Sequence, residues 1–385
     1  PLRARILLEQ GRIATNREGL DVAERLLNEA ISLADRLHIA SVATQSRVYL
    51  ANILARTNRL ALALPMAQAA VEKATEEDEQ HNLPTAQYCR GHLTYNSGET
   101  RKALPDLQAA LRGFQQMGDR VREGVCFGNL GEYHHYVGDS ERAKECYKNA
   151  QAIALEQGDK ASLVRGQRRL AWLHMDAGDW VSAEESIRRG LRVARELGDL
   201  PGVAAMVGNL GTVAASVGNL ELALERFKEA EHLANMHGNN DRSQTCRINI
   251  GLVLEKLDRI DEAFEVVNEL KAATAMVPVT RNLVTMLEMK LQIRREEWQT
   301  AIELGDIVMT ELENMQAWDR TVSVHAYRAI CTAALGEDPE PHFAKAKSIM
   351  KRLNLAEGSQ EGILIAEAMD QVNQLQQMAQ REDSA

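Results

Sequence analysis

Aromatic residues are scarce in this chain of 385 residues, because Phe, Trp and Tyr together make up only 4% of it. Sheets in sandwiches and barrels are rich in aromatic and β-branched side chains, so this composition disfavours them. Hydrophobic residues nevertheless account for 45% of the chain, which excludes wholesale disorder. The balance favours helices that pack through small and aliphatic side chains.

Long apolar runs are also missing. The longest candidate, residues 200–208, contains Pro201 and Gly202 and is far shorter than the roughly 18 residues that a membrane helix needs. We therefore expect no membrane association and no secretory signal. The chain opens at Pro1 inside a helical pattern, and we expect it to be a segment of a longer protein whose other domains are candidate partners.

Cysteine is sparse and irregularly placed. The chain has five cysteines, an odd number, without any CxxC spacing, and this pattern predicts reduced structural thiols in a cytoplasmic protein. Positive charge is also in deficit, since the formal net charge is −10 and the isoelectric point is about 5.6. This balance excludes a globally basic nucleic-acid binder, and we expect no direct nucleic-acid binding by this region.

Motifs for catalysis and cofactor binding are not found. The sequence lacks GxxxxGK[ST], HExxH and GxSxG, and its Cys and His residues do not have metal-ligand spacing. The string Gly128-Asn129-Leu130-Gly131 lacks the third glycine of a dinucleotide loop. We therefore expect neither an enzyme nor a cofactor or metal site.

What the sequence does contain is a repeat. A chain of this length suggests two or three domains or one repeat array, and alanine recurs in one register every 40 residues. Small residues and glycine turns recur at the same step, which indicates an array. The recurring alanines are Ala23, Ala63, Ala103, Ala143, Ala183, Ala223 and Ala263.

One repeat, residues 121–160, shows the physics of the unit. Its first half has apolar or small residues at helical spacing and ends at Gly138, which can adopt a positive φ. Asp139 then caps a second helix, which is expected to present Ala143, Tyr147, Ala150 and Leu155 on one face. Each repeat is therefore predicted to be a pair of antiparallel helices joined by a short turn.

This pattern resembles the tetratricopeptide repeat (TPR) family. The matching positions in two repeats are Phe127, Leu130, Gly131, Ala143, Tyr147 and Ala150, and then Val207, Leu210, Gly211, Ala223, Phe227 and Ala230. The step of 40 residues exceeds the usual 34 and is similar to a long-repeat subtype. That subtype includes the Leu-Gly-Asn spindle-orientation scaffolds and the sensor arms of bacterial maltose-type activators.

The resemblance implies an all-α fold, a right-handed superhelical solenoid of stacked helical hairpins with about 19 helices. Three parts are expected. Residues 1–273 hold seven regular repeats, residues 274–353 two degenerate hairpins, and residues 354–385 a capping helix and a tail. Stacked hairpins of this kind form a concave groove.

The resemblance also implies that the first helix of each repeat lines the groove, which would bind a peptide or protein partner without catalysis. The predicted groove residues are Tyr49, Asn52, Arg56, Tyr88, His92, Tyr95, Asn129, Glu132, His135, Arg165, Arg168, Arg169, Trp172, Asn209 and Asn249. Equivalent asparagines and arginines hold extended peptides in the Leu-Gly-Asn scaffolds. A second hypothesis is a ligand- or partner-sensing arm of a larger signalling regulator, transcription regulator or protease.

The basic residues of residues 160–176 have two interpretations. Arg165, Arg168, Arg169 and Trp172 follow the i, i+3, i+4, i+7 rule and are predicted to share one helix face. Such a guanidinium cluster suits a carboxylate, so an acidic extended segment is the expected partner. Alternatively, these arginines pair with acidic side chains of neighbouring helices, and Glu132 is the nearest by register.

Overall fold

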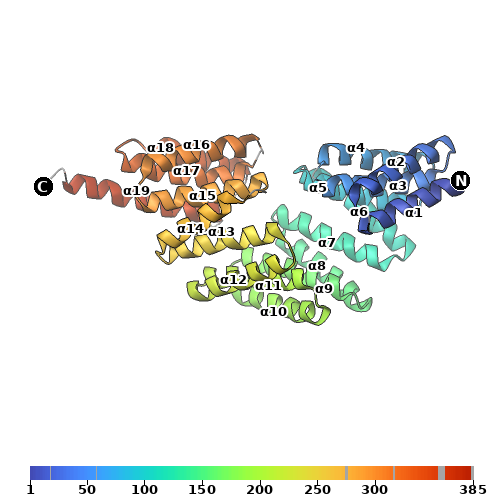
Figure 1. Ribbon diagram of the computed structural model, residues 1–385, viewed down its shortest axis with the longest axis horizontal. Coiled ribbons are helices and arrows are strands. Elements are labelled where there is room, and N and C mark those ends of the chain that lie inside the picture. Colours follow the sequence, from blue (N-terminus) through green and yellow to red (C-terminus); the bar gives the residue numbers. More distant parts are fainter. Residues whose placement is uncertain (18, 58, 274–275, 315–316, 354–359, 383–385) are drawn as a thin grey trace. The chain divides into compact units, whose positions relative to one another are not determined.

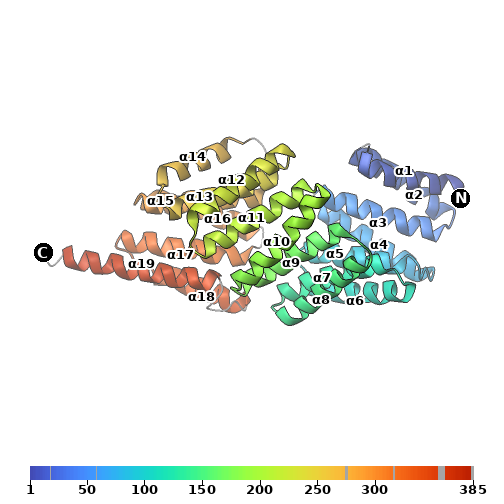
Figure 2. The same ribbon diagram turned by 90° about the horizontal axis from the view of Figure 1, so that it is seen from below.

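The computed structural model describes all residues except 18, 58, 274–275, 315–316, 354–359 and 383–385. Within the described residues the chain forms 19 helices and no strands, which confirms the predicted all-α class. The two helices of each regular hairpin lie side by side, as α7 and α8 do in both views (Figure 1, Figure 2). The structure divides into two compact units, residues 1–198 (unit 1) and 199–385 (unit 2).

Unit 1 contains five helical hairpins. Their helices are α1 (Leu2–Arg17), α2 (Leu20–Arg36), α3 (Ala40–Arg56), α4 (Leu60–Glu76), α5 (Leu83–Asn96), α6 (Thr100–Met117), α7 (Arg120–Tyr136), α8 (Ser140–Glu156), α9 (Lys160–Asp176) and α10 (Trp180–Leu197). Odd-numbered helices are the first helices of their repeats.

Unit 2 contains the remaining nine of the described helices. They are α11 (Leu200–Ser216), α12 (Leu220–Met236), α13 (Asn240–Lys256), α14 (Ile260–Ala272), α15 (Pro278–Arg294), α16 (Trp298–Asn314), α17 (Trp318–Ala334), α18 (Glu340–Leu353) and α19 (Gln360–Glu382). The expected division into regular repeats, degenerate hairpins and a capping segment stays a prediction. Of that last segment, residues 354–359 and 383–385 lie outside the described residues.

The turns before α7 to α13 repeat one local structure. Gly138 has a φ of 82°, which a residue without Cβ adopts freely. The next residue, Asp139, accepts a hydrogen bond from the Arg142 backbone N–H at 3.2 Å and caps α8. The same side-chain cap recurs at Asp119, Asp159, Asp179, Asp199, Asn219 and Asn239. In these turns a glycine therefore ends one helix, and the Asp or Asn that follows it starts the next.

Small residues on the first helices let the second helices approach closely. A Cβ at Gly11 would lie 2.8 Å from Leu27 Cγ, and one at Gly211 would lie 2.8 Å from Phe227 Cε1. Gly131 meets the ring of Tyr147 in the same way, sixteen positions further along the chain. In each of these pairs a large side chain of the second helix fills the space that a Cβ of the glycine would occupy. This contact explains why this position of the repeat carries a small residue.

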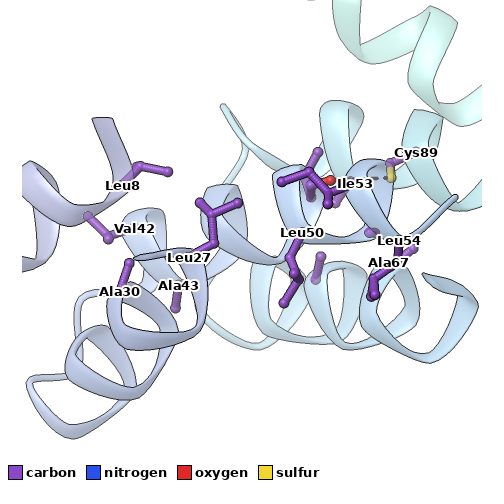
Figure 3. Close-up of a cluster of buried hydrophobic side chains, with 14 of the residues drawn as sticks. Leu8, Leu27, Ala30, Val42, Ala43, Leu50, Ile53, Leu54, Ala67 and Cys89 are labelled. Atoms are coloured by element: carbon purple, nitrogen blue, oxygen red, sulfur yellow. Dashed lines mark hydrogen bonds between the residues drawn. The ribbon is translucent and has the colours of Figure 1, made fainter. Parts of the chain in front are cut away.

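The core of unit 1 is built from aliphatic side chains of successive helices. Figure 3 shows Leu8, Leu27, Leu50 and Ile53 spread along one buried cluster to which α1, α2 and α3 contribute. Ile53 is 1% exposed. One expected core residue is not in place, because Leu155 is 63% exposed while Ala154 is buried. The inner stripe of α8 runs through positions 143, 147 and 154, and Leu155 lies about 100° further around the helix.

All five cysteines have free thiols, and four of them are buried. Burial raises the pKa of the Cys89 thiol to about 12, so this group is neutral at pH 7. Its Sγ lies 3.9 Å from the Val48 carbonyl oxygen (Figure 3). Among the described helices, none combines the length and apolarity that crossing a membrane requires.

Candidate functional site

Two adjoining cavities lie on the first helices of unit 1. The first, of about 420 Å³, is bounded by α3, α5, α7, the turn before α5 and the end of α6. The second, of about 350 Å³, is bounded by α5, α7, α8, α9 and the turn before α9. Tyr88 and Val125 line both cavities, so the two cavities adjoin, and we call them together the unit 1 groove.

A chain of polar side chains links three first helices between the cavities. The Asn129 amide donates to Tyr88 Oη at 2.9 Å, and Arg169 Nη2 donates to Asn129 Oδ1 at 3.4 Å. Arg169 Nε also donates to Glu132 Oε1 at 2.7 Å. Asn129 is 7% exposed, and its amide therefore has its partners within the protein. The chain joins α5, α7 and α9 and fixes the side chains along the groove.

Gly128 makes this network possible. The guanidinium of Arg169 lies directly against Gly128, where a Cβ would collide with it. The glycine of the Gly-Asn-Leu-Gly string therefore has a packing reason in unit 1, which is to admit the arginine of the next first helix.

Aromatic and imidazole rings lie beside this network, and of these Tyr88 and His92 line the second cavity whereas Tyr95 and Tyr136 line neither cavity. The Tyr88 and His92 rings stack with centroids 6.0 Å apart, and Tyr95 meets Tyr136 edge to face at 6.3 Å. Burial raises the pKa of Tyr88 to about 12, and burial lowers the pKa of His92. Both rings are therefore uncharged at neutral pH.

The residues predicted on α3 and α7 have different positions. Tyr49 and Asn52 line the first cavity, and Asn52 is exposed. Arg56 is exposed but does not line either cavity. His135 contacts Asp176 of α9 at 2.6 Å through its Nε2 atom, which links α7 to α9, and it lines neither cavity.

The arginine patch predicted on α9 divides in the structure. Arg165 and Arg169 line the second cavity, whereas Arg168 and Trp172 line neither of the two cavities. Arg169 pairs with Glu132, so the alternative interpretation is correct for this residue. Arg168 lies about 100° around the helix from Arg169. That Arg165, Arg168, Arg169 and Trp172 form one binding patch stays a prediction.

The two remaining predicted residues belong to unit 2. Asn209 on α11 is 8% exposed, and its Nδ2 makes no hydrogen bond within the described part of the chain. Asn249 on α13 is half-buried. Unit 2 also buries a charge, because Glu255 on α13 is 4% exposed and receives Lys290 and Arg294 at 2.7 Å each.

The sequence missed several residues that line the first cavity. These are Thr44, Gln45, Val48, His81, Asn82, Thr85, Phe114, Arg122 and Val125. Gln45, Thr85 and Val125 precede Arg165 at intervals of 40 residues. They occupy the position of Arg165 in earlier repeats, and this equivalence would have identified them from the sequence. Asn82 and Phe114 come from a turn and a second helix, and no repeat position marks them.

The described side chains contain no group of three or more Cys, His, Asp or Glu residues placed to hold a metal ion. What the groove offers instead is a row of amides, hydroxyls and rings on first helices. Such side chains can donate to and accept from a peptide backbone.

The fold of this chain is similar to the folds of several solved helical repeat proteins. One nearly full-length match is to the apo quorum sensor NprR from B. thuringiensis, at 13% identity over 90% of this chain and 98% of that chain, with a TM-score of 0.66. A Rap protein complexed with competence and sporulation factor matches at 16% identity over 96% of this chain and 99% of that one, with a TM-score of 0.59. A tetratricopeptide repeat protein from Parabacteroides merdae matches at 15% identity over 75% of this chain and 100% of that chain, with a TM-score of 0.53. At these identities the likeness shows the fold, which is that of a TPR-like helical repeat protein.

A family profile gives a more particular similarity. The profile described as cohesin loading factor matches residues 4–163, which is less than half of the chain and lies within unit 1. The matched range contains α1 to α8 and most of the unit 1 groove. No curated protein matches the chain.

Proposed function

We propose that this chain is a non-catalytic TPR-like scaffold whose unit 1 groove binds an extended segment of a peptide or protein partner. The observation that carries the proposal is that two adjoining cavities follow the first helices α3, α5, α7 and α9 in succession. A hollow that crosses several parallel first helices suits an extended chain better than it suits a compact ligand.

The polar lining supports this function. Gln45 and Asn52 line the first cavity, and each amide carries both donors and an acceptor for a peptide backbone. The groove network around Asn129 is already satisfied within the protein. The side chains there are pre-organised, which reduces the entropy lost on binding.

The comparisons support a binding function of this kind. The Rap protein was crystallised with competence and sporulation factor, and NprR is described as a quorum sensor. The cohesin loading factor profile covers the part of the chain that holds most of the groove. The long-repeat similarity to Leu-Gly-Asn scaffolds agrees with a groove that holds an extended segment.

A sensing arm of a larger regulator is the second candidate. It is favoured by the likeness to the quorum sensor NprR over 90% of this chain and by the resemblance to the arms of maltose-type activators. Binding in the groove would then alter an attached effector domain. The two functions share the binding step and differ in its consequence for the rest of the protein.

A selection experiment tests the binding step. The full chain is used to select peptides from a displayed library of random 12-residue sequences, and selected peptides are titrated calorimetrically. Asn52→Trp, at an exposed position of the first cavity, should weaken binding at least tenfold. Lys148→Trp, at an exposed position on the second helix α8, is the matched control and should leave it unchanged. If no peptide is selected, or both variants bind equally well, the groove does not have this function.

A further inference from the structure

The first cavity has walls suited to an uncharged occupant. Val48, Cys89 and Phe114 line it and are 7%, 2% and 1% exposed. The thiol is neutral because burial raises the pKa of Cys89 to about 12. Arg122, which is exposed, lies over the face of the Phe114 ring with its Cζ atom 5.7 Å from the centroid. A charged group placed against Val48, Cys89 and Phe114 would lose its hydration without gaining a partner from those three side chains.

One buried polar atom in this cavity points to a ligand. Thr44 is 1% exposed and lines the cavity, and its Oγ1 makes no hydrogen bond within the described part of the chain. Buried hydroxyls in folded proteins almost always have a partner. A peptide backbone group that enters beside an apolar side chain would satisfy Thr44 Oγ1.

The second cavity has the opposite character. Arg165 and Arg169 both line it, and Asp159 is the one carboxylate among the described residues that does so. That carboxylate is engaged in capping, since it accepts from the Ser162 backbone N–H at 3.0 Å and from Ser162 Oγ at 2.5 Å. Arg169 is held by Glu132. Arg165 donates to the neutral Ser162 Oγ at 2.6 Å and keeps further N–H donors for a carboxylate.

We propose that the unit 1 groove recognises a two-anchor motif, an apolar side chain held in the first cavity and an acidic side chain held by Arg165 in the second. This inference rests on the proposed function and adds the chemistry of the peptide to it.

The arrangement of helices sets the spacing of the anchors. The first cavity is centred on α5, and Arg165 lies on α9, two first helices further along. Neighbouring packed helices lie about 8–10 Å apart, and the arginine side chain shortens this path. An extended peptide advances about 3.3 Å per residue, so the two anchors are roughly four to six residues apart.

The test is a pair of selections with the full chain from the same library of displayed 12-residue peptides. Wild-type protein should enrich sequences with an apolar residue and an Asp or Glu roughly four to six positions away. The Arg165→Glu variant should enrich Lys or Arg in place of the acid and keep the apolar residue. Arg192→Glu, at an exposed position on the second helix α10, should enrich the wild-type motif.

The apolar anchor is tested separately. Thr85→Phe fills the first cavity and should weaken the binding of peptides selected with wild-type protein at least tenfold. Replacing the acidic residue of those peptides should reduce their affinity for this variant by the same factor as it reduces their affinity for the wild-type protein. Asn52→Phe narrows the same cavity from its exposed rim and replaces Thr85→Phe if that variant has a lower melting temperature.

The failures are distinguishable. Selected peptides that bind in the groove but lack the motif, or that do not change charge with Arg165→Glu, overturn the two-anchor inference and leave the binding function standing. Absence of any selected peptide overturns both.

Discussion

At the scale of single residues, the structure explains why glycine recurs on first helices. Gly131 lies under the ring of Tyr147, and Gly128 lies under the guanidinium of Arg169. The first glycine admits a core side chain of its own hairpin, and the second admits a groove side chain of the next hairpin. Packing and binding surface thus depend on residues three positions apart in α7.

A substitution series tests the packing role. Gly131→Leu should destabilise the protein by roughly 1–3 kcal/mol, because the added side chain occupies the space of the Tyr147 ring. Ala143→Leu, at a fully buried position, should have a similar effect. Glu145→Ala, on the exposed face of α8, should change the free energy of unfolding by less than about 0.5 kcal/mol. Equal effects of the three substitutions in urea titrations would show that the inner face is misassigned.

At the scale of elements, helices begin and end at a repeated turn whose first residue has a positive φ. Glycine occupies this place in most turns, as at Gly138, but His38, Asp78 and Asp258 adopt φ values of 52°, 50° and 60°. A side chain with a Cβ is strained in this region. The repeat therefore keeps the turn geometry even where the sequence departs from glycine.

Exchanging the turn residues should reveal this strain. His38→Gly should stabilise the protein by about 0.5–1 kcal/mol, and Gly138→Ala should destabilise it by about 1 kcal/mol, because only glycine adopts a positive φ without steric cost. Thermal and urea unfolding measure both changes. The two substitutions should change the free energy of unfolding in opposite directions. A loss of stability in His38→Gly would mean that the imidazole itself contributes to folding.

At the scale of the whole molecule, the chain divides into two compact units that can respond differently to solution conditions. Unit 2 buries His325 of α17, which is 5% exposed and has its ring 5.8 Å from that of His342. Burial, together with the nearby His342, Lys345 and Arg328, lowers the pKa of His325 to about 4. Arg328 itself is paired with Asp306 of α16 at 2.8 Å.

The stability of unit 2 should therefore fall in mild acid. The folded-state pKa of His325 is below the unfolded value of about 6.5, so its neutral form is favoured by folding. This contribution is complete above pH 6.5 and is lost as the pH falls through about 4, with a limit of roughly 3 kcal/mol.

The matched variant is His325→Phe, which keeps a ring of similar shape and cannot titrate. Urea titrations at several pH values should show a smaller loss of unfolding free energy between pH 6.5 and 4 in the variant than in the wild type. Carboxylates that titrate in the same range affect both proteins alike. Identical slopes would mean that His325 is not the group responsible.

Much of the fold could be predicted from the sequence. The 40-residue step, the recurring alanines and the glycine-acid turns identify helical hairpins, because helix periodicity, caps and positive φ are properties of a few adjacent residues. The expectation of about 19 helices agrees with the 19 described. The boundary between the two units follows Gly198, yet Asp199 caps α11 as the residue before each helix from α7 to α13 does, so no local signal marks it.

The sequence by itself determined the helical hairpins, their turns and the small residues that face inward, whereas the expectation of a groove on first helices came from the resemblance to tetratricopeptide repeats. Only the tertiary structure decided which groove residues act together. Arg169 is held by Glu132, Arg165 lines a cavity, and Phe114 reaches the groove from a second helix. The physical reason is that periodicity fixes an angular position within one helix, whereas a partner or a cavity depends on side chains that neighbouring helices bring within a few ångströms.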